Sequence, residues 1–137
     1  MQAVFDSFLA GFPVLMLHSS VTIAMLVAGV LVYMWITPWD EVKLIRAGNT
    51  AAAVSMGGAV IGLAIPLAFA MAASVSVYEI LVWGPVTLVL QIIAYRIADV
   101  VLKDLPNRIE QGEMGAAVLL VSIKLAAAAI NAAAVAG

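Results

Sequence analysis

The sequence predicts an all-α integral membrane protein with four transmembrane helices, arranged as two parallel helix-hairpin repeats with both termini outside. Three observations predict this class. The 137 residues are 66% hydrophobic and 10% charged, a composition far from that of soluble domains. Four stretches each offer the roughly 20 apolar residues that a spanning helix needs. The basic residues between these stretches fall in two short connections, and basic loops of this kind stay in the cytoplasm.

The first predicted span covers residues 12–37 and consists mainly of bulky aliphatic and aromatic residues. Residues 1–6 contain no basic residue, so we expect a retained helix rather than a cleaved signal peptide. The polar connection 38–48 follows, and its Lys43 and Arg46 predict a cytoplasmic location. Trp35 and Trp39 are expected to flank the inner membrane interface, which indole rings favour.

The second predicted span covers residues 49–76, and more than half of it is Ala, Gly, Ser or Thr. Asn49 is a favourable N-cap for this helix. Because small residues let helices approach closely in lipid, we expect Gly57, Gly58 and Gly62 at packed helix contacts. Pro66 lies within the span and predicts a kink or a tilt.

The third predicted span, 79–102, follows the second after a tight turn, so these two helices form an antiparallel hairpin. The polar connection 103–113 contains Lys103 and Arg108, which again predict a cytoplasmic location. The fourth span, 114–136, is rich in small residues, and Glu113 is suited to its N-terminus. We therefore expect the second and fourth spans to form the packed centre, with the first and third outside.

An internal similarity appears when the chain is shifted by 64 residues. The segment IRAGNTAAAV (45–54) then lies over IEQGEMGAAV (109–118). Each segment follows a polar connection and opens a helix of small residues. This predicts a parallel repeat within a single domain of residues 1–137, with units at about 12–76 and 79–136. Chance similarity between Ala-rich helices is the alternative explanation.

Two polar residues are expected near the middle of the bilayer. With a rise of 1.5 Å per residue, Lys124 lies about 16 Å from Glu113, and Gln91 lies about 18 Å from Lys103. No carboxylate is expected at this level. A charge there costs roughly 2.5–3.5 kcal/mol, and two interpretations follow. Lys124 either forms a structural tie with Gln91 and backbone carbonyls, or it lines a wet cavity or an oligomeric pore that favours anions.

Charged residues also follow the third span toward its cytoplasmic end. Arg96, Asp99 and Lys103 are spaced so that they share a helix face and neutralise one another. The set predicts a structural ladder of charges at the interface. A cytoplasmic gate or vestibule is the alternative interpretation.

Nearer the outer side, His18 and Asn131 are expected at a similar level, with Glu79 slightly further out. Such a group is able to bind a cation or relay a proton. One His and one Glu make a poor metal site, however, so no metal is predicted. The chain has no cysteine, and it lacks paired intramembrane carboxylates and phosphate-binding loops. The sequence therefore predicts neither an enzyme nor a bound cofactor.

The segment EVKLIRAGNTAAAVSMGGAVIGLAIPLA (41–68) resembles the conserved core of the YjfL-like family of small bacterial inner-membrane proteins, a domain of unknown function. The second half of the chain departs from this pattern, with Glu113 in place of Asn49 and Ser122 in place of Gly58. The resemblance implies four spans in two halves and a multi-pass location in the inner membrane. It implies no established activity. The matching positions are Gly48, Asn49, Ala51, Ala52, Ala53, Gly58 and Gly62.

Two functions are compatible with these observations. The first is an oligomeric membrane scaffold or a component of a pore or channel. The alternative is a small secondary transporter with a mid-membrane site near Lys124 and Gln91. The expected partners are the lipid bilayer, further copies of the chain and a cytoplasmic protein at residues 38–48 and 103–113. No nucleic acid is expected, because the chain has no basic cluster.

Overall fold

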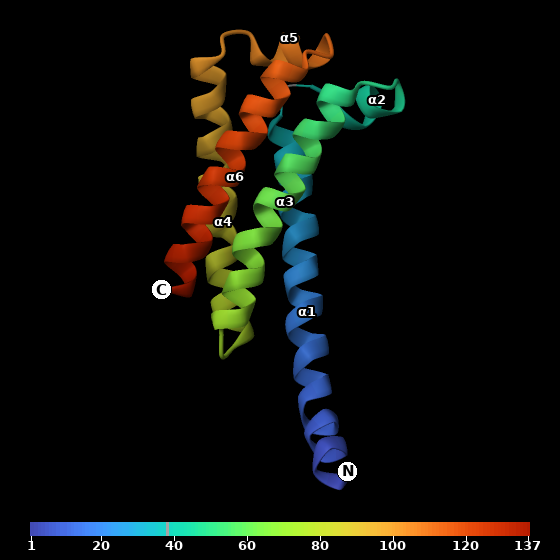
Figure 1. The fold of residues 1–137 in the computed structure, drawn as a ribbon, viewed down its shortest axis with the longest axis vertical. Coiled ribbons are helices and arrows are strands. Elements are labelled where there is room, and N and C mark those ends of the chain that lie inside the picture. The colour runs from blue at the N-terminus through green and yellow to red at the C-terminus, as the bar shows by residue number, and fades with distance from the viewer. Residues whose placement is uncertain (38) are drawn as a thin grey trace.

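The computed structural model describes residues 1–37 and 39–137, and these form six helices with no strand in the described part. Four of the helices are long and apolar enough to cross a membrane, which confirms the predicted class and the number of spans (Figure 1). The helices are α1 (Gln2–Ile36), α2 (Glu41–Arg46), α3 (Thr50–Ala73), α4 (Val77–Val101), α5 (Leu105–Glu110) and α6 (Met114–Ala136).

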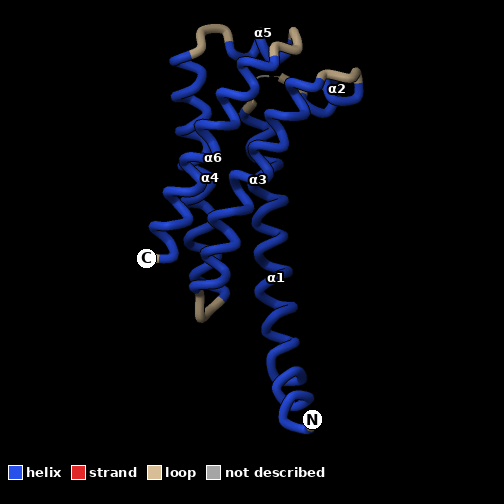
Figure 2. The backbone as a smooth tube through the Cα atoms, viewed as in Figure 1, coloured by secondary structure: helices blue, strands red, loops and turns tan. Residues whose placement is uncertain are grey.

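The four long helices run alongside one another, as the backbone trace shows (Figure 2). One end of the bundle carries α2 and α5 with their loops, and we call it the loop end. The other end carries the α3–α4 turn and lies on the side of both chain termini, and we call it the turn end. Helices α3 and α6 share the most extensive contact in the structure. The second and fourth predicted spans therefore form the packed centre, as expected.

Short helices α2 and α5 fill the two polar connections and were not predicted. Asp40 is the N-cap of α2, and its carboxylate accepts a hydrogen bond from Lys43 N at 3.0 Å. After these helices the chain turns through Gly48 and Gly112, whose φ values are +88° and +78°. Glycine adopts this left-handed conformation without the steric cost of a Cβ atom. Each turn then leads directly into a spanning helix.

Asn49 caps α3 as the sequence predicts. Its side-chain oxygen accepts a hydrogen bond from Ala52 N at 3.0 Å. Its amide nitrogen donates to the carbonyl oxygens of Ile109 at 2.9 Å and Glu110 at 3.1 Å. The same side chain therefore ties the α2–α3 loop to the end of α5.

Glu113 occupies the corresponding position before α6, but its side chain forms no capping hydrogen bond. The capping expected of Glu113 is thus not present. Its carboxylate accepts instead from Arg108 Nε at 2.7 Å and forms a salt bridge with the same guanidinium group. This hydrogen bond holds the pKa of Glu113 below its ordinary value. The Glu113 side chain is longer than that of Asn49, and Arg108 lies nearby. The ion pair with Arg108 is therefore favoured over a hydrogen bond from the backbone amides of α6.

Two of the three predicted packing glycines lie in the contact between α3 and α6. A Cβ atom on Gly58 would lie 2.5 Å from Val121 Cγ2, and one on Gly62 would lie 3.8 Å from Lys124 Cβ. Gly57 differs from the prediction, because a Cβ there would meet nothing within 4 Å. Adjacent helical residues point about 100° apart, so Gly57 and Gly58 cannot share one contact. Helix α3 continues through Pro66 and ends at Ala73.

Candidate functional site

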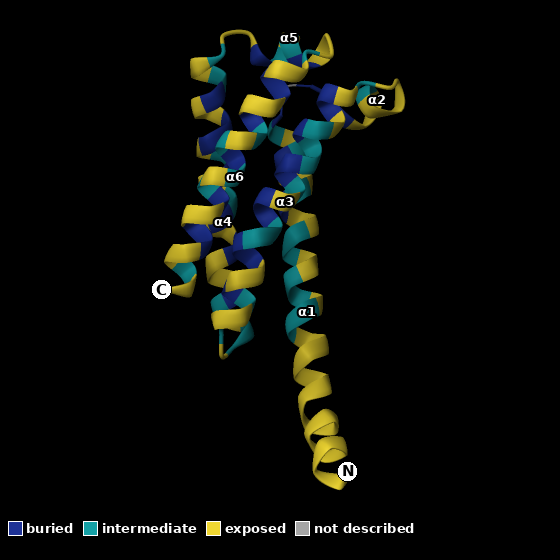
Figure 3. Cartoon of the chain, viewed as in Figure 1, coloured by how far each residue is buried: buried dark blue, intermediate teal, exposed yellow. Residues whose placement is uncertain are grey.

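Polar side chains collect inside the bundle, although most of its surface is apolar. Burial of the facing sides of the long helices is visible in Figure 3. Polar groups within a membrane bundle are costly and commonly functional, so this region is the candidate site. We call it the polar core, and its members are Tyr33, Thr37, Glu41, Ser55, Thr87, Gln91, Tyr95, Lys124 and Asn131, all of them buried.

Lys124 lies at the centre of the polar core and has no exposed surface. Its Nζ lies 2.5 Å from Tyr33 Oη and 4.1 Å from the centre of the Tyr33 ring. Side chains lean toward the N-terminus of their own helix, so Lys124 on α6 leans toward the loop end and Tyr33 on α1 toward the turn end. The two side chains therefore approach each other. Lys124 faces its own bundle rather than lipid.

Gln91 lies close to Lys124 but does not form the hydrogen bond considered from the sequence. Its Oε1 would lie 3.3 Å from a Cβ atom on Gly62, the residue that also adjoins Lys124. Neither Nε2 nor Oε1 of Gln91 has a hydrogen-bond partner among the described residues. The Tyr33 hydroxyl takes the place of Gln91 as the partner of Lys124.

Glu41 supplies a carboxylate that the sequence analysis did not place near Lys124. It is the first residue of α2 and is 1% exposed. Burial raises the pKa of Glu41 to about 7, and the positive charge of Lys124 acts against this rise. Its Oε1 has no hydrogen-bond partner in the described part of the chain. Glu41 is therefore a buried carboxylate at the loop end of the polar core, which the sequence does not predict.

Aromatic rings enclose the polar core on the loop-end side. The ring of Tyr95 packs edge-on against Tyr33 at 6.4 Å and against Trp39 at 5.8 Å between ring centres. Trp39 is 3% exposed, so it is a core residue rather than the interfacial one expected. Among the described residues, Tyr95 Oη, Trp39 Nε1 and Ser55 Oγ lack hydrogen-bond partners. Buried polar atoms without partners are rare in folded proteins, which singles out this region.

The polar core continues toward the turn end along α4 and α6. Thr87, Gln91 and Tyr95 are spaced by four residues and so lie on one face of α4. Asn131 on α6 donates to Thr87 Oγ1 at 3.1 Å. Asn131 and Lys124 are seven residues apart, which places them on a common face of α6. Polar side chains thus occupy successive levels through much of the bundle.

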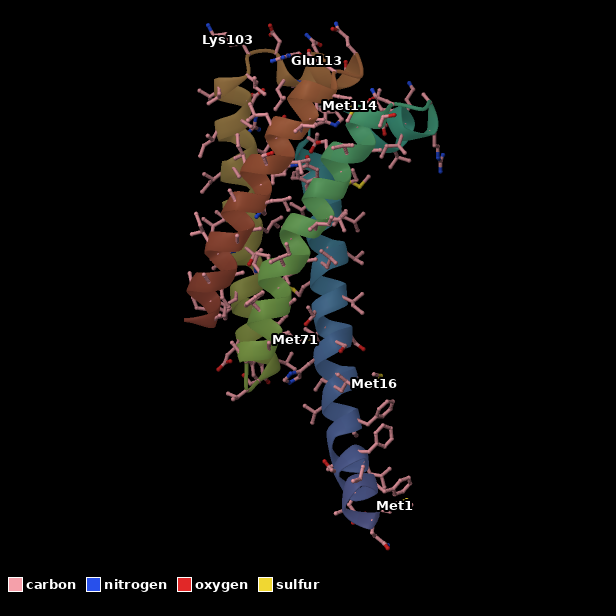
Figure 4. All side chains as sticks on the ribbon, viewed as in Figure 1. Met1, Met16, Met71, Lys103, Glu113 and Met114 are labelled. Carbon is pink, nitrogen blue, oxygen red and sulfur yellow. The ribbon has the colours of Figure 1, made fainter. Side chains whose placement is uncertain are left out.

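The charges at the end of α4 lie outside the polar core. Arg96 is exposed and its guanidinium carbon lies 5.4 Å from the ring centre of Tyr95. Lys103 lies at the rim of the loop end, with its side chain directed away from the bundle (Figure 4). Within the described ranges no salt bridge joins Arg96, Asp99 and Lys103. These side chains are solvated or half-exposed, so the predicted ladder of ion pairs does not form.

The group of His18, Glu79 and Asn131 is likewise not assembled. Asn131 binds Thr87, while Glu79 Oε2 accepts a hydrogen bond from Val75 N at 3.1 Å. His18 is half-buried on α1. Residues 1–37 and 39–137 contain no group of three or more His, Asp or Glu side chains able to hold a metal ion.

Glu41→Gln is expected to remove most of the pH dependence of stability near neutral pH. The folded state holds the Glu41 proton up to about pH 7, whereas the ordinary pKa is 4.5. The folded state therefore binds more protons between these values, so stability is full below pH 4.5 and is lost as pH rises through about 7. Unfolding of purified protein by SDS titration, followed by tryptophan fluorescence from pH 4 to 8, measures this slope.

The matched control for this measurement is Glu110→Gln, because Glu110 is exposed on α5. That variant should retain the slope of the wild-type protein. A wild-type stability that is constant or rises over this interval would contradict the buried state of Glu41.

Comparison with known proteins places these residues in a family. The sequence profile of the Domain of Unknown Function (DUF350) matches residues 7–135. The chain belongs to the DUF350 family. It is also 31% identical over 111 residues to the UPF0719 inner membrane protein YjfL of Escherichia coli strain K12, and equally to that of Escherichia coli O157:H7. Each alignment covers 81% of this chain and 84% of the relative. No solved structure matches the chain.

The DUF350 match confirms the family resemblance seen in the sequence. Together with the four apolar helices, it identifies a multi-pass protein of the bacterial inner membrane. Every residue of the polar core lies within the matched range of 7–135. The polar core is therefore part of the DUF350 domain itself.

Proposed function

We propose that this DUF350 protein is a small secondary transporter that moves protons across the inner membrane through the polar core of each chain. One observation carries the proposal: Lys124 is fully buried against Tyr33, and the buried carboxylate of Glu41 lies close enough to respond to its charge. Chains of ionisable groups inside membrane proteins commonly serve proton transfer. A proton passes between hydrogen-bonding groups, so a core closed to larger solutes is suited to it.

The chemistry of the polar core supports this role at both ends. Glu41 lies nearest the loop end, and its pKa of about 7 suits proton exchange near neutral pH. Toward the turn end, Gln91, Thr87 and Asn131 supply donors and acceptors that are able to hold water molecules. The path proposed for the proton runs from Glu41 past Lys124 to these residues.

We further propose that the loop end faces the cytoplasm and that both termini lie outside. The connections at the loop end contain Lys43, Arg46, Lys103 and Arg108, and basic loops remain in the cytoplasm. The N-terminal residues and the α3–α4 turn contain no Lys or Arg. Glu41 would then exchange its proton with the cytoplasm.

A parallel repeat is the origin that we propose for the bundle. Helices α2 and α5 begin 64 residues apart, as do α3 and α6. The backbone bond from Asn49 N to Leu44 O is matched by that from Glu113 N to Arg108 O, both at 2.9 Å. Equivalent turns and helix starts in both halves support a duplication better than chance similarity of composition.

The second candidate is an oligomeric scaffold or pore. Its support comes from Gly57 on α3 and Gly115 on α6, which both leave open space at the bundle surface where a neighbouring helix is able to approach closely. A cytoplasmic partner would dock on the two loops near Asn49 and Gln111, which line a shared cleft. Lys124 would not line such a pore, because it faces its own bundle.

Proton flux into proteoliposomes tests the leading proposal. Purified protein is reconstituted with the pH-sensitive dye pyranine inside the vesicles, and a potassium gradient with valinomycin imposes a membrane potential. The wild-type protein is expected to change internal pH several times faster than empty vesicles. Glu41→Gln and Tyr33→Phe should each reduce the flux to near the empty-vesicle rate, because each removes an exchangeable proton from the polar core.

The control is Tyr78→Phe, which removes the same hydroxyl group from an exposed tyrosine at the turn end and should retain full flux. Wild-type flux equal to that of empty vesicles would overturn the proposal. Flux that survives both core substitutions would favour the oligomeric pore.

A further inference from the structure

The first half of α1 extends beyond the rest of the bundle. Helix α1 has 35 residues and is about 52 Å long, whereas the other long helices have 23 to 25 residues and measure roughly 35 Å. Residues 2–17 are exposed on every side, as Figure 3 shows. Counted from Ile36, about 24 residues of a tilted helix are able to cross the hydrocarbon core. Residues 2–12 therefore lie beyond it at the turn end, where Met1 is far from Met16 in Figure 4.

Residues 2–12 differ in pattern from the rest of α1. Successive helical residues turn by about 100°, which gathers the bulky apolar side chains on one face. The rings of Phe8 and Phe12 on that face lie 5.2 Å apart. From Val14 to Leu17 every residue is apolar, so the helix becomes apolar all round. The apolar face of residues 2–12 consists of Val4, Phe5, Phe8, Leu9 and Phe12, and the opposite face of Gln2, Ala3, Asp6, Ser7 and Ala10.

This change of pattern coincides with Gly11 and Pro13. Pro13 lies inside α1 and has no N–H group to donate to the preceding turn, which makes it a position where helices bend. Gly11 adds backbone freedom close by. A helix that leaves the hydrocarbon core at this level has a built-in point at which to change direction.

We propose that residues 2–12 lie along the bilayer surface at the turn end, with the phenylalanine face among the acyl chains and a bend at Gly11–Pro13. One-sided amphipathic helices bind membranes in this way. Asp6 is the one charged side chain in the segment, which contains no Lys or Arg. The surface it fits is therefore that of zwitterionic lipid, without a requirement for anionic headgroups.

A second copy of the chain is the other occupant that would cover this face. Helices of two copies approach closely in a membrane through small residues, whereas this face consists of Phe, Leu and Val side chains. The one-sided pattern also ends at Pro13, which is the expected membrane boundary, and this coincidence favours lipid. The inference is independent of proton transport, because none of its residues belongs to the polar core.

Site-directed spin labelling tests this placement in the full-length chain. The protein has no cysteine, so single cysteines at each position from 3 to 12 provide unique labels in phosphatidylcholine nanodiscs. Collision with oxygen reports lipid, and collision with nickel–EDDA reports water. We expect the oxygen-to-nickel ratio to oscillate with the helical period, several-fold higher at Phe8 and Leu9 than at Ser7 and Ala10. Labels at Leu15 and Leu17 should report lipid throughout.

Four outcomes would overturn the inference. Nickel access on both faces would mean a free helix in water, and oxygen access on both faces would mean full insertion. Low access to both reagents on the phenylalanine face would indicate contact with a second copy. An oscillation that appears only after phosphatidylglycerol is added would show a need for anionic lipid.

Discussion

Lys124→Met is expected to lower the free energy of unfolding by about 2 kcal/mol, because removing one partner of a buried hydrogen bond leaves the other partner unsatisfied. The partner left behind is Tyr33 Oη, which lies 2.5 Å from Lys124 Nζ on a side chain that is 1% exposed. Methionine keeps much of the apolar length of lysine but donates no hydrogen bond.

A double-mutant cycle with Tyr33→Phe isolates this coupling. The two substitutions together should cost less than the sum of their separate costs, because the double variant removes both partners and leaves neither unsatisfied. SDS unfolding curves of the four proteins give these numbers, and Lys103→Met at the exposed rim should stay within about 0.5 kcal/mol of wild type. Additive costs would show that Tyr33 and Lys124 do not interact.

The position of Glu41 shows where the sequence was insufficient. Counting the rise per residue along each span placed Lys124 near the middle of the membrane, and Lys124 is indeed buried within the bundle. The same counting assigned Glu41 to a polar connection outside the membrane. Helix α2 turns that connection so that Glu41 faces the bundle. A six-residue helix is too short for periodicity to be recognised, so the burial of Glu41 is not predictable from the sequence.

The spans themselves were predictable because their signal is compositional. Long apolar stretches require helices, since the bilayer satisfies no backbone hydrogen bonds. The turns through Gly48 and Gly112 depend on the paths taken by α2 and α5, which composition does not specify. The interfacial position expected for Trp39 is wrong for the same reason. A tryptophan beside a polar loop usually lies at the interface, but here the loop folds back and buries it.

Pairing between α3 and α6 gives the second large expected effect. Gly58→Leu should lower the free energy of unfolding by about 3 kcal/mol, the upper part of the usual range for overpacking. Even a Cβ atom at this position would lie 2.5 Å from Val121 Cγ2 and 3.1 Å from Val121 Cβ. Valine is branched at Cβ and has few alternative rotamers, so α6 itself would have to move away.

The neighbouring glycine provides the control for this effect. Gly57→Leu adds the same side chain one residue earlier, where a Cβ atom meets nothing within 4 Å. Leucine also favours the helix over glycine by roughly 0.5–1 kcal/mol, so this variant should be as stable as wild type or slightly more stable. SDS unfolding of both variants measures the difference. Equal losses at Gly57 and Gly58 would contradict the packing of α3 against α6 through Gly58.

A loss of stability confined to Gly58 would show that a single face of α3 holds the two halves of the chain together. Gly62 lies on that same face and adjoins Lys124. The close contact that stabilises the bundle would then also position the polar core.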